Sequence, residues 1–490
     1  MSAEIQANDT RVTQFEEKET QLTKVKQDIK NWFQERDWSE FSLNLTIIVF
    51  LITFGLLIRI LLAYDYRVDF SLTGTEIIWN RHVNFYPNGA NFAGYGDFPF
   101  YYINWIEAWF QDGWYPYTDW RLTVPGDPLY FYSYPPIFLY FLVAIWRPGM
   151  TNLWMAFPMI LADAACAGVV YLILREMIKG EHSRIIAFIG GFLMLLSPIN
   201  VIYDGVYWLN PGPVTLFTLV SFYFIVKRKW RNAFFWLAIA TMTKQNALFF
   251  TYPIFLIMVG EKVRADGIKK GVIESIMIGI YYLLICFCCS IPWIFITPIH
   301  FGAHLLFPGQ FLSLSTVIDE PLINHTIQLS WSFKQLNMAD QFVNLVAFGI
   351  NSMFFMILAA SIMAIFLFWR AYQNKLDNIK FFEWIAIYTI LTHVLMPRGV
   401  YKFYSAYYMP ILLVALIGTL TYYSKKSIFT TASILVAGGL FMGFSIWHLV
   451  IDRYFTPSIL ILACIIIGIL AGLRSAFIFW KNKRIKMSVI

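Results

Sequence analysis

Residues Leu43–Leu62 read LNLTIIVFLITFGLLIRILL, which is apolar almost throughout. A helix that crosses a membrane needs about 20 such residues, because the hydrocarbon core is about 30 Å thick. Comparable runs recur along the chain, so the sequence predicts an all-α, polytopic transmembrane helix bundle of about 12 spans. The run Tyr134–Trp146 is too short to cross and is expected to be interfacial or re-entrant. The expected spans lie near residues 43–62, 153–174, 185–198, 212–226, 232–246, 248–260, 272–296, 341–369, 380–396, 407–423, 428–449 and 457–480.

The composition of the chain also indicates a membrane protein. Of the 490 residues, 58% are hydrophobic and 14% are charged, and the mean hydropathy is +0.59. Soluble proteins usually carry about 25% charged residues. The net charge of +7 comes from short basic clusters between apolar runs and not from one basic stripe. We therefore expect a lipid bilayer, and no nucleic acid, as a partner.

The positions of the basic clusters predict the topology. With a cytoplasmic N-terminus, these clusters fall in cytoplasmic loops, while the alternate loops hold isolated basic residues, as the positive-inside rule requires. The predicted parts are a charged, amphipathic segment (1–40), a first transmembrane helix (41–64), a long first extracytoplasmic loop with interfacial helices (65–152), transmembrane helices (153–296), a second long extracytoplasmic loop (297–340), further transmembrane helices (341–480) and a basic cytoplasmic tail (481–490).

Three polar turns are predicted on the extracytoplasmic side, at Asp204–Gly212, Thr243–Asn246 and Met396–Tyr404. Charged groups at membrane depth are costly and indicate a functional site. Lys244, Arg398 and Lys402 would together hold a phosphate group. The alternative for each cation is a side chain that caps a helix or reaches to the interface.

The first extracytoplasmic loop contains the candidate general base. Asp97 stands between a glycine and a run of aromatic residues, followed by an expected interfacial helix at Ile103–Gln111. A partly desolvated carboxylate there would accept a proton from a sugar hydroxyl. A solvated aspartate in a turn is the alternative. Spacing alone does not separate the two.

Several of these motifs resemble GT-C superfamily glycosyltransferases, and most closely the group that uses dolichyl-phosphate glucose to extend the N-glycan precursor. Asp163 within an apolar helix also fits that group. The turn Gly205–Asn210 and the segment Arg398–Lys402 depart from its pattern, so related GT-C mannosyltransferases stay open. The motifs that carry the resemblance are Gly96-Asp97-Phe98, the Trp-containing helix Asn104–Phe110, Trp114-Tyr115-Pro116, Tyr134-Pro135-Pro136 and Lys244-Gln245-Asn246-Ala247-Leu248-Phe249-Phe250.

The resemblance implies an inverting hexosyltransferase that takes its sugar from a polyprenyl (dolichyl) phosphate donor. The implied acceptor is a lipid-linked glycan or another extracytoplasmic acceptor, and the implied membrane is the endoplasmic reticulum or an archaeal or bacterial plasma membrane. Asp97 would be the general base, and the resemblance implies no metal and no cofactor. The predicted donor-phosphate and substrate-binding residues are Lys244, Gln245, Arg398, Lys402, Asp127, Tyr134 and His304.

Other readings of the sequence are a metal site, a transporter or flippase, and an oligosaccharyltransferase. His300 and His304 have a spacing compatible with zinc if the segment is helical, but no third ligand is evident nearby. A transporter is expected to have interrupted helices in matching halves, whereas the polar residues here gather on one face. An oligosaccharyltransferase would need a Trp-Trp-Asp-Tyr-Gly motif, which the chain lacks.

Overall fold

The structure is a computed structural model of the chain. It describes residues 38–66, 98–111, 117, 132, 134–145, 151–306, 326–327, 339, 341, 353–394, 400–401, 404–423 and 427–450. The expected N-terminal amphipathic segment, the span near 457–480 and the basic tail lie outside these residues, apart from the helical positions 38–40.

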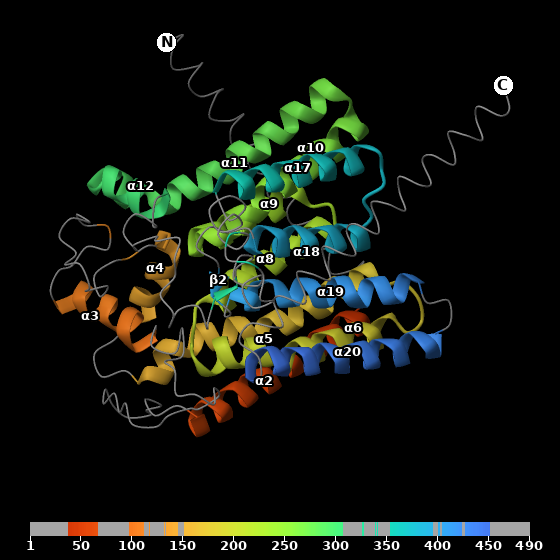
Figure 1. The fold of residues 1–490 in the computed structure, drawn as a ribbon, viewed down its shortest axis with the longest axis horizontal. Coiled ribbons are helices and arrows are strands. Elements are labelled where there is room, and N and C mark those ends of the chain that lie inside the picture. Colours follow the sequence, from red (N-terminus) through yellow and green to blue (C-terminus); the bar gives the residue numbers. More distant parts are fainter. Residues whose placement is uncertain are drawn as a thin grey trace, which may run out of the picture. The chain divides into compact units, whose positions relative to one another are not determined.

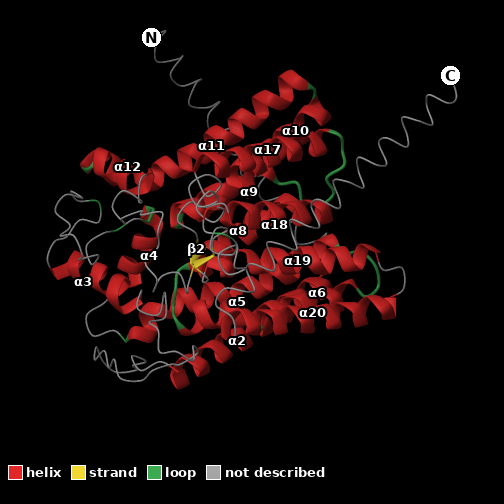
Figure 2. Cartoon of the chain, viewed as in Figure 1, coloured by secondary structure: helices red, strands yellow, loops and turns green. Residues whose placement is uncertain are grey.

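The described part of the chain is almost entirely helical, which confirms the all-α prediction (Figure 2). Two strands of two residues each, β1 (Thr326–Ile327) and β2 (Val400–Tyr401), pair antiparallel. The helices are α2 (Trp38–Tyr66), η1 (Phe98–Ile103), α3 (Asn104–Gln111), α4 (Pro136–Ile145), α5 (Asn152–Met177), α6 (Ser183–Leu195), α7 (Pro198–Asn200), η4 (Val201–Val206), α8 (Pro211–Val226), α9 (Trp230–Thr243), η5 (Gln245–Ala247), α10 (Leu248–Asp266), α11 (Ile268–Ile296), α12 (Pro298–Leu306), α17 (Met353–Tyr372), α18 (Asn378–Val394), α19 (Ser405–Tyr423) and α20 (Ser427–Val450).

Among the described residues, six helical segments are long and apolar enough to cross a membrane, so the chain is polytopic. Shorter apolar helices add to them, and the expected number of about 12 spans stays a prediction. In the run at 134–146 the described residues contain the ten-residue helix α4, which is shorter than a span needs. The six segments are Trp38–Asp65, Asn152–Met177, Ser183–Val206, Gln245–Asp266, Ile268–Ile296 and Ser405–Tyr422.

The chain divides into two units, residues 1–50 and 51–490, with the division inside α2. In the first unit the described residues form the first half of this helix, where the Trp38 ring packs edge-on against Phe41 at 5.7 Å. In the second unit, neighbouring helices pack pairwise: α5 packs along α6 and α8, α8 along α9, α10 along α17, and α18 along α19 (Figure 1).

Local sequence explains where several helices begin and end. The Thr151 hydroxyl accepts a hydrogen bond from the Trp154 amide at 3.2 Å and caps α5. Pro211 opens α8, a position at which its missing N–H costs nothing. Gly267 separates α10 from α11 with a φ of +82°, a conformation that glycine adopts without strain. Lys244 ends α9 in an extended conformation, with φ −155° and ψ 132°, before η5 and α10 begin.

Candidate functional site

Lys244 occupies the break between α9 and η5, and its side chain is almost fully buried, with 2% of its surface exposed. Its Nζ donates a hydrogen bond to Asn210 Oδ1 at 2.7 Å. Asn210 lies in the turn between η4 and α8. Two of the three polar turns expected from the sequence therefore meet at this ammonium group, and Tyr404, the last residue of the third, also contacts it.

Three tyrosine rings surround the same ammonium group. Lys244 Nζ lies 5.1 Å from the Tyr134 ring centre, 4.6 Å from Tyr404 and 5.3 Å from Tyr407. The faces of these rings attract a cation, and the attraction strengthens where water is excluded. Tyr134 precedes α4, while Tyr404 and Tyr407 lie at the start of α19. We call Lys244, Asn210 and these tyrosines the Lys244 site.

An aromatic cluster holds the end of the first loop against this site. Trp105 of α3 packs edge-on against Tyr132 at 5.0 Å and against Tyr134 at 5.7 Å. The hydroxyls of Tyr117 and Tyr132 donate to the carbonyl oxygens of Tyr134 and Pro135 at 2.6 and 3.0 Å. Burial raises the pKa of Tyr117 and of Tyr132 well above the usual tyrosine value, so both hydroxyls stay protonated donors. The Tyr134-Pro135-Pro136 motif is thereby fixed in place.

The start of the first loop reaches the same region. Phe98, which follows Asp97 in sequence, is buried and packs edge-on against Trp208 at 4.9 Å. Trp208 belongs to the turn that carries Asn210, and its φ of +60° is uncommon for a residue with a side chain. The sequence predicts a turn at Asp204–Gly212. In the structure, Asp204 to Val206 belong to the π-helical segment η4, and all residues from Asp204 to Gly212 are buried.

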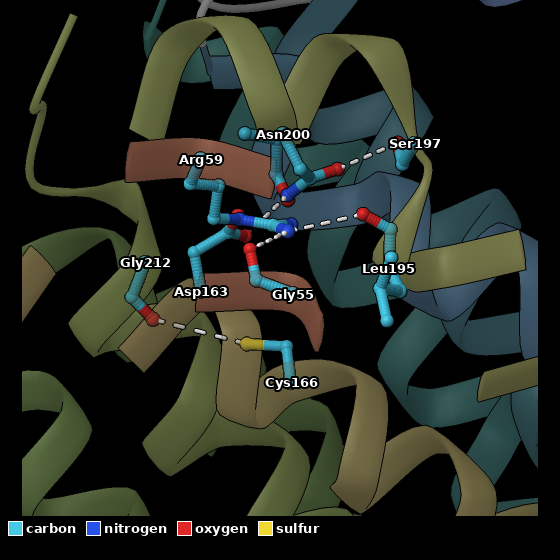
Figure 3. Close-up of polar contacts among 9 residues, drawn as sticks. Gly55, Arg59, Asp163, Cys166, Leu195, Ser197, Asn200 and Gly212 are labelled. Atoms are coloured by element: carbon cyan, nitrogen blue, oxygen red, sulfur yellow. Dashed lines mark hydrogen bonds and ion pairs between the residues drawn. The ribbon is translucent and has the colours of Figure 1, made fainter. Parts of the chain in front are cut away.

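Beside this turn lies a buried ion pair between α2 and α5. Arg59 Nε donates to Asp163 Oδ2 at 2.6 Å, and both side chains are fully buried. Arg59 Nη1 donates to the carbonyl oxygens of Gly55 and Leu195, each at 3.1 Å (Figure 3). An ion pair removed from water needs such additional hydrogen bonds to offset its desolvation.

Two further polar side chains extend this pair. Asn200 of α7 donates from Nδ2 to Asp163 Oδ1 at 3.3 Å and to the Ala406 carbonyl oxygen at 3.2 Å. The carboxylate of Asp204 is also fully buried, and it interacts electrostatically with Asp163 and Arg59. Two carboxylates thus lie beside one guanidinium group.

The predicted site residues differ in how far the structure places them. Lys244 and Tyr134 come together, and Gln245 follows Lys244 in η5 with its Oε1 buried. Asp97, Asp127, Arg398 and Lys402 lie outside the described residues. His304 is part of α12, as is His300, so the two are four residues apart on a helix, but the side chain of His304 is outside the described residues. Within the described residues, no group of three or more His, Cys, Asp or Glu could hold a metal ion.

Some residues of the site were missed by sequence reasoning. Arg59 is the one charge within Leu43–Leu62, and a charge inside an apolar run was a signal that could have marked it. Tyr407 and Asn200 carry no such signal, because a tyrosine near a helix start and an asparagine after a proline are common.

Comparison with known proteins supports a glycosyltransferase. Residues 128–306 match the family model described as dolichyl-phosphate-mannose-protein mannosyltransferase, a GT-C family. The GT-C resemblance is confirmed. The narrower resemblance to dolichyl-phosphate-glucose enzymes is not confirmed. A search of curated proteins found no match. The GT-C match contains Tyr134, Asn210 and Lys244, and it supports a membrane glycosyltransferase with a dolichyl-phosphate sugar donor.

Proposed function

We propose that this protein transfers a hexose, with mannose the first candidate, from dolichyl phosphate to a hydroxyl group of an extracytoplasmic acceptor. The observation that carries the proposal is the Lys244 site. A buried cation meets the end of the first loop, a polar turn and the start of α19. A fixed cation at membrane depth fits the phosphate of a lipid-linked sugar, because the low dielectric strengthens its attraction for an anion.

The reaction is an inverting displacement. Asp97 takes the proton of the acceptor hydroxyl as the oxygen of that hydroxyl attacks the anomeric carbon of the sugar. The bond from that carbon to the phosphate oxygen breaks, and dolichyl phosphate leaves with the bonding electrons. Lys244, with Arg398 and Lys402, neutralises the leaving phosphate, a form of electrostatic stabilisation that is worth most where water is excluded.

The packing of Phe98 supports the same site for base and cation. Phe98 follows Asp97 and contacts Trp208, two residues before Asn210, which binds Lys244. Tyr134, Gln245, Asp127 and His304 are proposed to contact the substrates. Glycosyl acceptors and donors are rich in hydroxyl groups, which such polar and aromatic side chains bind well.

The experiment uses the purified full chain with dolichyl-phosphate mannose, dolichyl-phosphate glucose and a nucleotide sugar as separate donors. Lipid-linked glycans and hydroxyl-bearing peptides serve as acceptors, and mass spectrometry identifies the products. Transfer from a dolichyl-phosphate sugar with inversion is expected. Transfer only from the nucleotide sugar, or no transfer from any donor, would overturn the proposal.

Two substitutions test the role of the base. Asp97→Asn keeps the shape of the side chain but removes the proton acceptor, so turnover should fall by about 10²–10⁴-fold while the donor still binds. Asp127→Asn is the comparison variant, since the sequence predicts a turn at Asp127-Pro128, and its loss of turnover should be smaller. A near-normal Asp97→Asn variant beside an inactive Asp127→Asn variant would mean that Asp127 is the base.

The proposed face of the membrane has its own test. Single cysteines introduced near Gly113 should react with an impermeant maleimide in intact cells. Cysteines near Lys229 or Lys426 should react only after the membrane is opened. The reverse pattern would contradict an extracytoplasmic active site.

A further inference from the structure

Two series of contacts connect the buried Arg59–Asp163 pair to the Lys244 site. One runs through the turn that carries Asn210. The other runs through Asn200 to the start of α19, which carries Tyr404 and Tyr407. An effect of these contacts on sugar transfer rests on the proposed function, whereas the contacts themselves do not depend on it.

The turn that carries Asn210 lies directly against the ion pair. A Cβ on Gly205 would lie 2.6 Å from Arg59 Cγ. A Cβ on Gly212 would lie 2.8 Å from the Met159 carbonyl oxygen and 3.2 Å from Asp163 Cβ. Only glycine allows this close approach at both ends of the turn. The position of Asn210, and with it the acceptor for the Lys244 ammonium, is therefore set by the packing on Arg59 and Asp163.

In the second series, Asn200 connects the ion pair to the start of α19 through a hydrogen bond to the backbone. Its Nδ2 donates to the carbonyl oxygen of Ala406, which lies between Tyr404 and Tyr407 in sequence. Both rings face the Lys244 ammonium, at 4.6 and 5.3 Å. Asn200 thus ties the backbone between the two tyrosines to α7.

The amide of Asn200 can take only one orientation. The carboxylate of Asp163 and the carbonyl oxygen of Ala406 are acceptors, so the NH₂ group must face them. The Ser197 hydroxyl donates to Asn200 Oδ1 at 2.9 Å from the opposite side (Figure 3). All four side chains Arg59, Asp163, Ser197 and Asn200 are fully buried. A fully buried and fully oriented amide in such a network restricts a backbone segment to one position.

We propose that the Arg59–Asp163 pair and Asn200 position the Lys244 site by holding Asn210 and the start of α19 against the lysine. None of the three contacts the donor phosphate. They are positioning residues, and they act through Asn210, Tyr404 and Tyr407. This gives a role in the site to a charge in the first transmembrane helix, far from Lys244 in sequence.

The first test measures how accessible Lys244 is, without any need for transfer activity. The purified full chain is treated with an amine-reactive acylating reagent, and the labelling rate of Lys244 is measured by peptide mass spectrometry against the exposed Lys227. In Asn200→Leu the two donated hydrogen bonds are lost, so Lys244 labelling should rise about tenfold. The matched control is Thr218→Val, whose buried hydroxyl donates to the Val214 carbonyl oxygen within the same helix, and its Lys244 labelling should match wild type.

A paired substitution separates positioning from stability. Arg59→Met alone leaves Asp163 as an uncompensated buried charge and should lower the Tm strongly. Arg59→Met combined with Asp163→Leu replaces both charges by apolar groups, so the Tm should recover. Lys244 labelling should nevertheless stay raised in the double variant, because Asn200 has lost its acceptor on Asp163. Recovery of both the Tm and the native labelling rate would show a structural role alone and overturn the proposal.

The transfer reaction supplies a third measurement. Because Lys244 acts on a charge that the donor carries before and during the reaction, Asn200→Leu should raise the KM for the dolichyl-phosphate sugar more than it lowers kcat. If wild type transfers no sugar, the proposed function fails while the labelling comparison still decides the positioning role. If Asn200→Leu does not fold, Ser197→Ala replaces it, since this variant removes only the hydroxyl that orients the amide. Native labelling in a folded Asn200→Leu or Ser197→Ala protein would refute the inference.

Discussion

The Lys244→Met substitution tests the centre of the candidate site. It keeps the length and volume of the side chain but removes the ammonium group. Two opposite unit charges about 4 Å apart attract each other by about 4 kcal/mol at an effective dielectric constant of about 20. Arg398 and Lys402 are proposed to share the phosphate, which reduces the loss. We therefore expect kcat/KM for the dolichyl-phosphate donor to fall by about 10²–10³-fold.

The same substitution should change stability far less. The variant loses a charge-assisted hydrogen bond to Asn210, worth about 1.5–3 kcal/mol, and the attraction of three tyrosine rings, worth about 2 kcal/mol. It also avoids the burial of an ammonium group, which costs several kcal/mol. These contributions nearly cancel, so the Tm in detergent should stay within about 5 °C of wild type.

Two control variants complete this prediction. Lys227→Met removes a lysine that is 31% exposed and forms a surface pair with Glu176 at 3.5 Å. Its kcat/KM and Tm should stay close to wild type, because exposed pairs contribute about 0–1 kcal/mol. Lys244→Arg keeps the charge and should retain more activity than Lys244→Met. A folded Lys244→Met protein with kcat/KM within about threefold of wild type would refute the phosphate role.

Three further outcomes are expected. Transfer should survive EDTA, because catalysis is assigned to a carboxylate and fixed cations; activity lost on chelation and restored by a divalent ion would contradict this. Tyr117→Phe leaves the Tyr134 carbonyl oxygen without its donor and should cost about 1–3 kcal/mol of stability. Since the folded-state pKa of Tyr117 is raised, its contribution is present below about pH 10 and is lost as the pH rises further. The Tm of wild type should therefore fall more steeply than that of Tyr117→Phe between about pH 9 and 11, and parallel curves would argue against a buried neutral hydroxyl. Asp204→Asn removes one of two neighbouring buried carboxylates, so its Tm should equal or exceed that of wild type; a fall of more than about 5 °C would show that the Asp204 carboxylate has a stabilising partner.

Much of the helical architecture could be predicted from the sequence, because lipid imposes simple rules on it. A backbone in hydrocarbon must satisfy its own hydrogen bonds, so long apolar runs become helices. Each expected span from 43–62 to 428–449 overlaps an observed helix where its residues are described, although the helix ends shift by several residues. Helix ends are set by caps and by single residues such as Gly267, which an apolar run does not reveal.

The convergence of separate motifs could be predicted only in part. Topology alone placed the turns with Asn210 and Lys244 on one face, together with Tyr134, and the structure brings these residues into contact. The sequence did not reveal that Lys244 lies among three rings. Contacts of this kind depend on how helices pack and rotate, which the hydrophobic pattern does not define.

The buried ion pair shows why sequence reading fails at such a site and where it could improve. Arg59 lies inside an apolar run whose length alone predicts a membrane span, although a charge in such a run carries a high energetic cost. That cost is reduced here because Asp163 accepts a hydrogen bond from Arg59 Nε, and the carbonyl oxygens of Gly55 and Leu195 accept hydrogen bonds from Nη1. A charge buried in a transmembrane helix needs a partner of opposite charge on another helix. The two partners therefore define which helices must pack together. Pairing Arg59 with Asp163 in this way would have placed the Arg59 segment of α2 against α5, and so beside the turn that leads to Lys244.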